Sequence, residues 1–282
     1  MARKTDPNNM SFLDHLEELR WHLIRATLGI VLGAVIAFVF KDFFIGTLLM
    51  GPKHLDFPTY QWLCDLGTSI GMGSGTCIEE LPFTIENRQA PGQFTAFIWL
   101  SLTFGFIMAF PWVIYQFWSF VSPGLKRSER RSSRAVIVFC SILFFMGVLF
   151  GYYIITPLSI NFFANFQLSE EISNMWDVDS YVGLVRSCVL ACGIMFELPI
   201  VIFFLAKAGL VTADFLRRNR KYALVLILIL AAFITPPDVI SQVIVAVPVL
   251  LLYEMSIWIA VWIERRARKR EKRRLAGAVK SN

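Results

Sequence analysis

The sequence is poor in charged residues and in the side chains of common catalytic sites. Asp, Glu, Lys and Arg form 17% of its 282 residues, whereas they form about 25% of an ordinary soluble domain. Only three histidines are present. Neither the H-E-x-x-H motif of zinc proteases nor the P-loop of nucleotide hydrolases occurs. These absences argue against a soluble protein, a metal or cofactor site, and a chain that hydrolyses nucleotides.

Apolar side chains dominate instead: 56% of the residues are hydrophobic, with 26 Phe and 8 Trp. A helix needs about 20 apolar residues to cross a bilayer, and six stretches reach or approach that length. The fifth has about 13 residues, or about 20 Å of helix, so it requires a locally thinner bilayer or a partly buried end. We predict an all-α polytopic membrane protein with six transmembrane helices, the fifth and sixth short, in a single membrane domain over 1–282. The expected spans are 23–49, 93–121, 135–163, 181–210, 222–234 and 239–263.

Positive charge gathers on one side of these spans. Most of the 27 Lys and Arg residues lie before the first span, in two alternate loops and in the tail 264–282. By the positive-inside rule both termini are cytoplasmic, and the long polar loop 50–92 is on the outer side. The tail follows a membrane helix directly, so we expect it to fix the topology and to meet anionic lipids rather than nucleic acid.

The outer loop contains two cysteines, Cys64 and Cys77, on either side of a segment rich in Gly, Ser and Thr. A disulfide is chemically permitted on the outer side of a cell membrane. The alternative is two free thiols in an oxidising space. Pro52, at the start of this loop, is expected to have a structural role in the outer turn.

The segment before the first span, 10–22, combines an apolar stripe with a cluster of charges. It predicts an amphipathic helix at the cytoplasmic interface that runs into the first span. Local pairing can explain some of the charges, because Glu17 precedes Arg20 by three residues and Glu18 precedes His22 by four. The other hypothesis is that Glu18 is held ready for a cationic partner.

A second acid supports that hypothesis. Glu129 is the only acid in the basic loop SPGLKRSERRSSR between the second and third spans. It too can pair locally with its basic neighbours. Two carboxylates on one membrane face can also each bind a guanidinium through two charge-assisted hydrogen bonds. The expected ligand is then a short extended peptide with two arginines.

Several longer motifs follow one another between about residues 10 and 262. In this order and spacing they resemble the TatC family, the membrane receptor of the twin-arginine protein translocase. The first outer loop is longer than the family pattern, and Glu17 stands where the family often has an apolar residue. The motifs are DHLEELRWHLIR, YQFWSFVSPGLKRSERR, GYYIITPL, FELPIVIFFLAKAGLV and ITPPDVISQ.

The resemblance implies a non-enzymatic receptor in the bacterial inner membrane, without cofactor, that binds twin-arginine signal peptides of folded cargo at its cytoplasmic face. It implies that Glu18 and Glu129 meet the two arginines, that Arg20 and Phe120 take part in recognition, and that Glu17 competes with Glu18 for the role. It further implies single-span partners of the TatA and TatB type, assembly of several copies, nucleation of the translocation complex, and transport driven by the proton-motive force.

Polar residues also occur within the expected spans. Glu197 lies near mid-membrane, where an ionisable side chain is costly and is a functional candidate by default. The resemblance places it in a polar groove, and the alternative is a hydrogen bond that only serves helix packing. Asp238 is expected to cap the sixth span after a tight outer turn. Gln242, one turn deeper, is available to a partner helix.

Two other classes fit less well. The sequence GTSIG around Ser69 matches the G-x-S-x-G motif of hydrolases, with His54 as the only histidine on the same side. That motif requires a strand, a sharp turn and a helix, whereas we expect a glycine-rich loop. A small-solute transporter predicts two related halves with broken helices at matching positions, and the six unequal spans show no such repeat.

Overall fold

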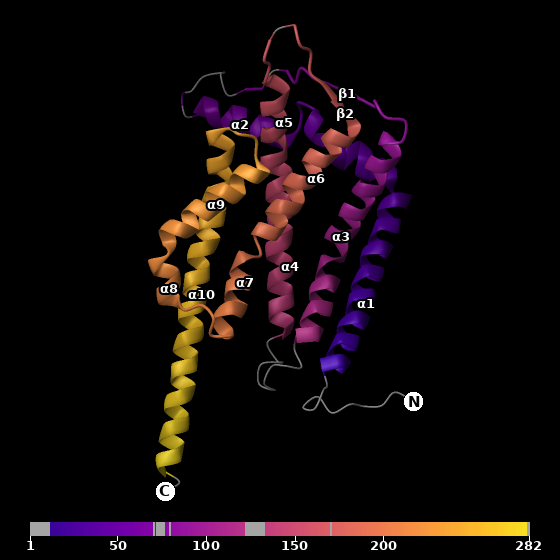
Figure 1. Cartoon of the computed structure of the whole chain (residues 1–282). Coiled ribbons are helices and arrows are strands. Elements are labelled where there is room, and N and C mark those ends of the chain that lie inside the picture. The colour runs from indigo at the N-terminus through magenta and orange to yellow at the C-terminus, as the bar shows by residue number, and fades with distance from the viewer. Residues whose placement is uncertain are drawn as a thin grey trace, which may run out of the picture.

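The computed structural model describes residues 12–69, 71, 77, 78, 80–121, 133–169 and 171–280. Long helices form a bundle, and short elements cover one end of it (Figure 1). We call this the loop end; it carries α2 (Pro58–Ser69), β1 (Thr84–Glu86) and β2 (Met175–Asp177). The opposite end, where α1 (Phe12–Val39) begins and α10 (Val239–Lys280) leaves the bundle, is called the terminal end.

Helix α1 runs unbroken from Phe12 to Val39. The segment that we expected at the interface, 10–22, therefore continues the first span as one straight helix from Phe12 onward (Figure 1). The first span is expected to reach residue 49, but the α-helix ends at Val39, and a π-helical segment, η1 (Phe43–Leu49), follows. Three tyrosine hydroxyls hold the end of η1 and the turn after it, because they donate to the backbone oxygens of Leu48, Leu49 and Pro52 at 2.8 Å.

Helix α3 (Gly92–Val121) packs antiparallel to α1 at close range. A Cβ atom on Gly33 would lie 2.8 Å from the Gly105 oxygen, and one on Gly105 would lie 2.5 Å from the Ala34 nitrogen. Glycine is required at this crossing because any side chain would enter the backbone of the facing helix. The indole Nε1 of Trp112 also donates to the Arg25 oxygen at 3.0 Å.

The third and fourth spans both contain irregular turns near a proline. The third consists of α4 (Ser133–Phe150), the π-helical η6 (Gly151–Ile155) and α5 (Thr156–Asn165). Pro157 lacks an N–H for the preceding turn, and the Thr156 hydroxyl donates to the Gly151 oxygen at 2.8 Å. The fourth span is two helices, α6 (Val178–Met195) and α7 (Leu198–Lys207), instead of the single helix expected over 181–210.

After the short α8 (Ala213–Arg218), α9 (Arg220–Ile234) and α10 form the last pair. Five helices in the described part of the chain are long and apolar enough to cross a membrane. The 15 residues of α9 span only about 22 Å, so the count of six spans stays a prediction. The expectation of a short sixth helix is wrong: α10 has 42 residues. It continues because the basic tail is rich in Arg, Lys, Glu and Ala, which favour helix.

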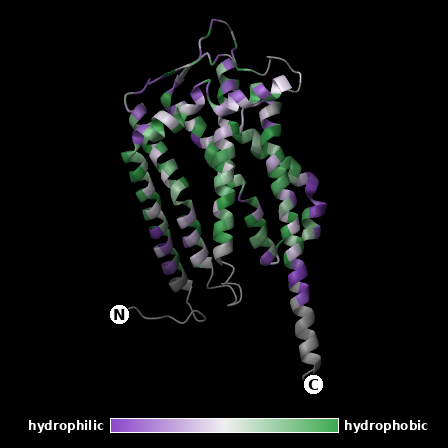
Figure 2. Ribbon diagram, turned by 180° about the vertical axis from the view of Figure 1, so that it is seen from behind, coloured by the Kyte–Doolittle hydropathy of each residue, from purple (hydrophilic) through white to green (hydrophobic). Residues whose placement is uncertain are grey.

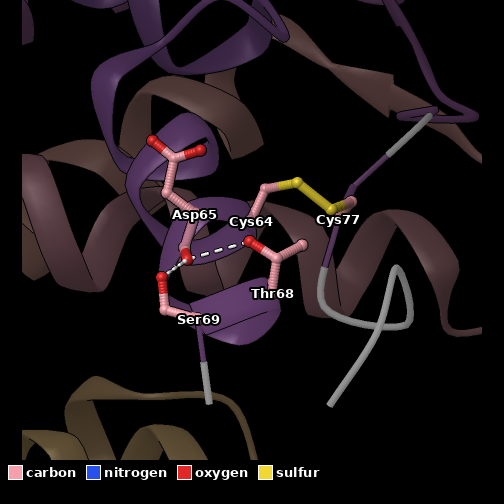
Figure 3. The surroundings of a disulfide bond; sticks show 5 residues. All are labelled: Cys64, Asp65, Thr68, Ser69 and Cys77. Atoms are coloured by element: carbon pink, nitrogen blue, oxygen red, sulfur yellow. Dashed lines mark hydrogen bonds between the residues drawn. A yellow bond between two sulfur atoms is a disulfide. The ribbon is translucent and has the colours of Figure 1, made fainter. Parts of the chain in front are cut away.

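The outer loop 50–92 is more ordered than expected, since it contains η2 (Gly51–Lys53), α2 and β1. β1 pairs in parallel with β2, so the two connections at the loop end form one small sheet. A disulfide joins Cys64 of α2 to Cys77 (Figure 3). Ser69 ends α2 and its hydroxyl donates to the Asp65 oxygen at 2.6 Å (Figure 3). No strand leads into the GTSIG sequence within the described residues around it, so the nucleophile elbow of a hydrolase is not formed.

Hydrophobic residues occupy the middle of the bundle. Hydrophilic residues lie toward both ends, and along α1 and α10 near the terminal end (Figure 2). The core lies on both sides of α6: Cys188 and Cys192 face α9 and α10, whereas Tyr181 and Val185 face α3 and α4. Many large apolar side chains point outward instead, among them Trp258 at 78% exposed. An apolar surface around an apolar core is what a bilayer solvates.

Candidate functional site

The terminal end of α1 faces the last turns of α3. His22 Nδ1 lies 2.8 Å from the Gln116 Oε1 atom, and Gly33 touches Gly105 eleven residues further along each helix. The two helices therefore keep an even antiparallel register. Four residues from the hydrogen-bonded pair in the opposite direction, toward the terminal end, Glu18 is level with Phe120, one turn beyond that pair.

The carboxylate of Glu18 is half-buried on this face. Its Oε2 atom is buried and has no hydrogen-bond partner among the residues that the structure describes. A buried acceptor without a partner costs about 1–3 kcal/mol, and more when it is charged. Within the described chain, Glu18 therefore keeps an unused acceptor on the face of α1 that meets α3.

Local pairing does not use up this carboxylate. The expected contact from Glu18 to His22 is replaced by the bond between His22 and Gln116. Within the described residues the ion pairs are those of Arg88 with Glu86 and Arg220 with Glu254, and neither Glu17 nor Arg20 takes part. The side chains of Glu17 and Arg20 are both exposed on the surface of α1.

Aromatic and amide side chains of α3 lie next to this site. Phe120 is half-buried and lies edge-on to His22, with ring centroids 6.4 Å apart. Gln116 is 3% exposed, and Trp118 is 4% exposed and packs on Phe204 of α7. Gln116 was not among the residues expected at this site. In the sequence it stands out only as an amide side chain within an apolar helix, 94 residues away from His22.

Glu129, the second expected acid, lies outside the described residues, and so does most of its basic loop. Helix α3 ends at Val121, next to Phe120 and at the level of Glu18. The expectation that Glu129 lies within reach of a peptide bound at Glu18 stays a prediction.

Glu197 stands at the break between α6 and α7, where the chain leaves helical hydrogen bonding before Pro199. Its side chain is half-buried, and the Cys140 thiol of α4 lies within hydrogen-bond reach. The Oε1 atom of Glu197 is buried without a partner among the described residues. The break therefore holds a carboxylate with spare acceptor capacity inside an apolar bundle.

The remaining expected residues lie at the loop end. Asp238 Oδ2 accepts the Ser241 N–H at 2.7 Å and thus caps α10. Gln242 Nε2 donates to the Leu228 oxygen of α9 at 3.0 Å, so it joins the last two helices and does not meet Glu197. Pro52 is buried and its oxygen accepts from Tyr60.

Known proteins match this chain over most of its length. Residues 14–248 match the family model of TatC, the Sec-independent protein translocase protein. A TatC from Blattabacterium of Periplaneta americana is 37% identical over 93% of this chain and 99% of its own. A TatC from Desulforapulum autotrophicum is 38% identical over 87% and 82%.

Solved structures agree with these relatives. A crystal structure of the twin-arginine translocase receptor TatC superimposes with a TM-score of 0.65 at 32% identity, over 89% of this chain and 99% of that one. A second, solved in the detergent DDM, gives a TM-score of 0.67 at 33% identity over 87% and 99%. Together with the helical bundle and its apolar surface, these matches show that the chain belongs to the TatC family of Sec-independent protein translocases, multi-pass proteins of bacterial membranes that serve transport and are not enzymes.

Proposed function

We propose that this chain is the receptor subunit that binds twin-arginine signal peptides of folded proteins at its terminal end. In this proposal the terminal end faces the cytoplasm, because it carries the basic segments of the chain. The observation that carries the proposal is the buried, unpartnered oxygen of Glu18 at the level of Phe120. Support also comes from the solved TatC structures, which are described as twin-arginine translocase receptors.

Recognition begins with a guanidinium of the peptide at Glu18. Arginine offers a planar fork of N–H donors that matches a carboxylate, whereas lysine offers a single charged amine. The guanidinium satisfies the unpartnered Oε2 atom, and the neighbouring Phe120 ring favours the cation further. The second arginine of the motif goes to Glu129. Arg20, exposed on the same helix beside this site, takes part in recognition in this proposal.

Glu197 has a different role in this proposal. It lies at a helix break beside Cys140 of α4, and it belongs to a part of the bundle other than the α1–α3 face that carries Glu18. We assign it to the transport step, in contact with single-span partners of the TatA and TatB type and driven by the proton-motive force. Several copies of the chain nucleate this complex, and the basic tail meets anionic lipid of the inner leaflet.

Site-directed photocrosslinking tests the receptor role. A photoreactive residue replaces Glu17, which is exposed and adjacent to Glu18, and in a second variant it replaces Phe233 at the loop end. A signal peptide with two arginines is expected to crosslink at position 17 and not at position 233. The same peptide with two lysines is expected to crosslink at least tenfold less at position 17. Equal labelling at both positions, or by both peptides, would contradict the proposal.

A further inference from the structure

A second candidate site lies at the loop end, away from Glu18. A pocket of about 710 Å³ opens between the end of α5, strand β2, the first turns of α6 and the end of α9. Its size falls in the range of pockets that hold small molecules, about 300–1,000 Å³. None of the residues assigned to signal-peptide recognition lines it.

The pocket extends from the charged rim along α6 into the apolar span. Asp177 stands just before Val178, where the apolar span begins, and the lining continues inward through Ser180, Gly183 and Ser187. This path covers about 15 Å of helix. Aromatic side chains form much of the remaining wall, namely Phe163, Phe166, Trp176 and Phe233.

Part of this aromatic wall is open to the surroundings of the bundle. Phe166 is 55% exposed and Phe233 is 85% exposed. In a chain that crosses a membrane, exposed rings at this depth face the boundary between acyl chains and headgroups. The pocket is thus apolar on its membrane side and polar at its rim.

The rim carries one charge of each sign among the described lining residues. The Arg88 backbone N–H donates to Asp177 Oδ1 at 3.2 Å, and the Arg88 Nη2 atom donates to the Met175 oxygen at 3.0 Å. These bonds hold the two charged residues beside each other. A guanidinium has five N–H donors, and its Nε atom lies 3.9 Å from a Glu86 oxygen, so most of its donors stay available.

We propose that this rim pocket binds a phospholipid with a zwitterionic headgroup that carries an ammonium N–H, as phosphatidylethanolamine does. Arg88 binds the lipid phosphate, because a guanidinium pairs with phosphate oxygens through parallel hydrogen bonds. Asp177 accepts from the ammonium, and the upper acyl chain lies along Phe166 and Phe233. An anionic headgroup without an ammonium would leave Asp177 facing negative charge.

Native mass spectrometry of the intact protein with defined lipids tests the charge pairing. The wild-type chain is expected to retain phosphatidylethanolamine at least tenfold better than phosphatidylglycerol, and better than phosphatidylcholine, whose quaternary ammonium cannot donate. Arg88→Gln is expected to lower this retention at least tenfold, and Asp177→Asn to remove the preference over phosphatidylglycerol. Lys53→Gln removes a cation at the same end that lies over Phe83 outside the pocket, and it should change nothing. Equal retention of all three lipids by the wild-type chain would overturn the proposal.

A photoreactive phosphatidylethanolamine tests the position without any substitution. Labelling in liposomes is expected to concentrate on the peptides that contain Phe166 and Phe233. Two results would refute the lipid site. One is labelling that spreads evenly over the exposed faces of α1 and α10. The other is labelling of the pocket that a single-span partner helix abolishes, together with no preference among the lipids. Neither experiment uses a signal peptide or export, so the lipid site and the receptor function can fail independently.

Discussion

Replacing Glu18 by Gln separates the proposed ligand acid from its neighbour Glu17. The substitution keeps the size of the side chain but removes the charge that a guanidinium would pair with. Glu18 has a buried oxygen without a partner in the described chain, whereas Glu17 is exposed. A charge-assisted hydrogen bond contributes about 1.5–3 kcal/mol, and each 1.4 kcal/mol corresponds to about a tenfold change in affinity.

We therefore expect Glu18→Gln to weaken binding of a twin-arginine signal peptide about 10- to 150-fold. The matched variant Glu17→Gln removes a charge in the exposed position and should weaken binding about fivefold at most, the scale of a surface ion pair worth up to about 1 kcal/mol. Fluorescence anisotropy of a labelled signal peptide with the purified protein in nanodiscs measures both. An equal loss in the two variants would show that general negative charge, and not the buried carboxylate, attracts the peptide.

Other substitutions test the scaffold and the second acid. Gly105→Val should lower the free energy of unfolding by about 1–3 kcal/mol, measured as a lower melting temperature. Gly46→Ala should not lower it, because nothing lies within 4 Å of the added Cβ. Similar shifts in the two variants would disprove the close helix crossing. Asp238→Ala should cost about 1 kcal/mol through loss of the α10 cap, and an unchanged melting temperature would argue against that cap. Cys77→Ser should leave Cys64 open to alkylation without reductant; if the wild-type protein is alkylated equally, the disulfide is absent. Glu197→Gln should reduce export of a twin-arginine reporter with unchanged signal-peptide binding, and an equal loss of both would place Glu197 in the binding site.

The positions of most helices could be predicted because burial in lipid imposes a simple length and composition rule. The second span, expected over 93–121, is observed as Gly92–Val121, and the fifth ends at Ile234 as expected. Asp238 was identified as a cap from its place after two prolines, and it bonds the Ser241 N–H. These features depend on residues that are neighbours in sequence.

The irregular parts of the helices could not be predicted in the same way. The sequence stays apolar on both sides of the break at Glu197, so a window of apolar residues gives no sign of the break. Helix α2 was expected as loop because it lies in the long polar segment 50–92 and runs into the glycine-rich stretch before Cys77. Tertiary contacts stabilise it, since Tyr60 is 3% exposed and bonds the Pro52 oxygen, and burial raises the pKa of this hydroxyl above its usual range.

The choice between Glu17 and Glu18 shows most clearly what the structure adds. The two acids are adjacent, so composition and charge treat them alike, and helical periodicity alone does not say which face meets a second helix. The bond between His22 and Gln116 fixes that face, and Glu18 shares it because it lies four residues before His22. Glu17 is turned about 100° away along the same helix and is exposed. In the function that we propose, a signal peptide that reaches α3 at Phe120 would meet Glu18 and not Glu17, and this choice rests on a contact between residues 94 positions apart in the sequence.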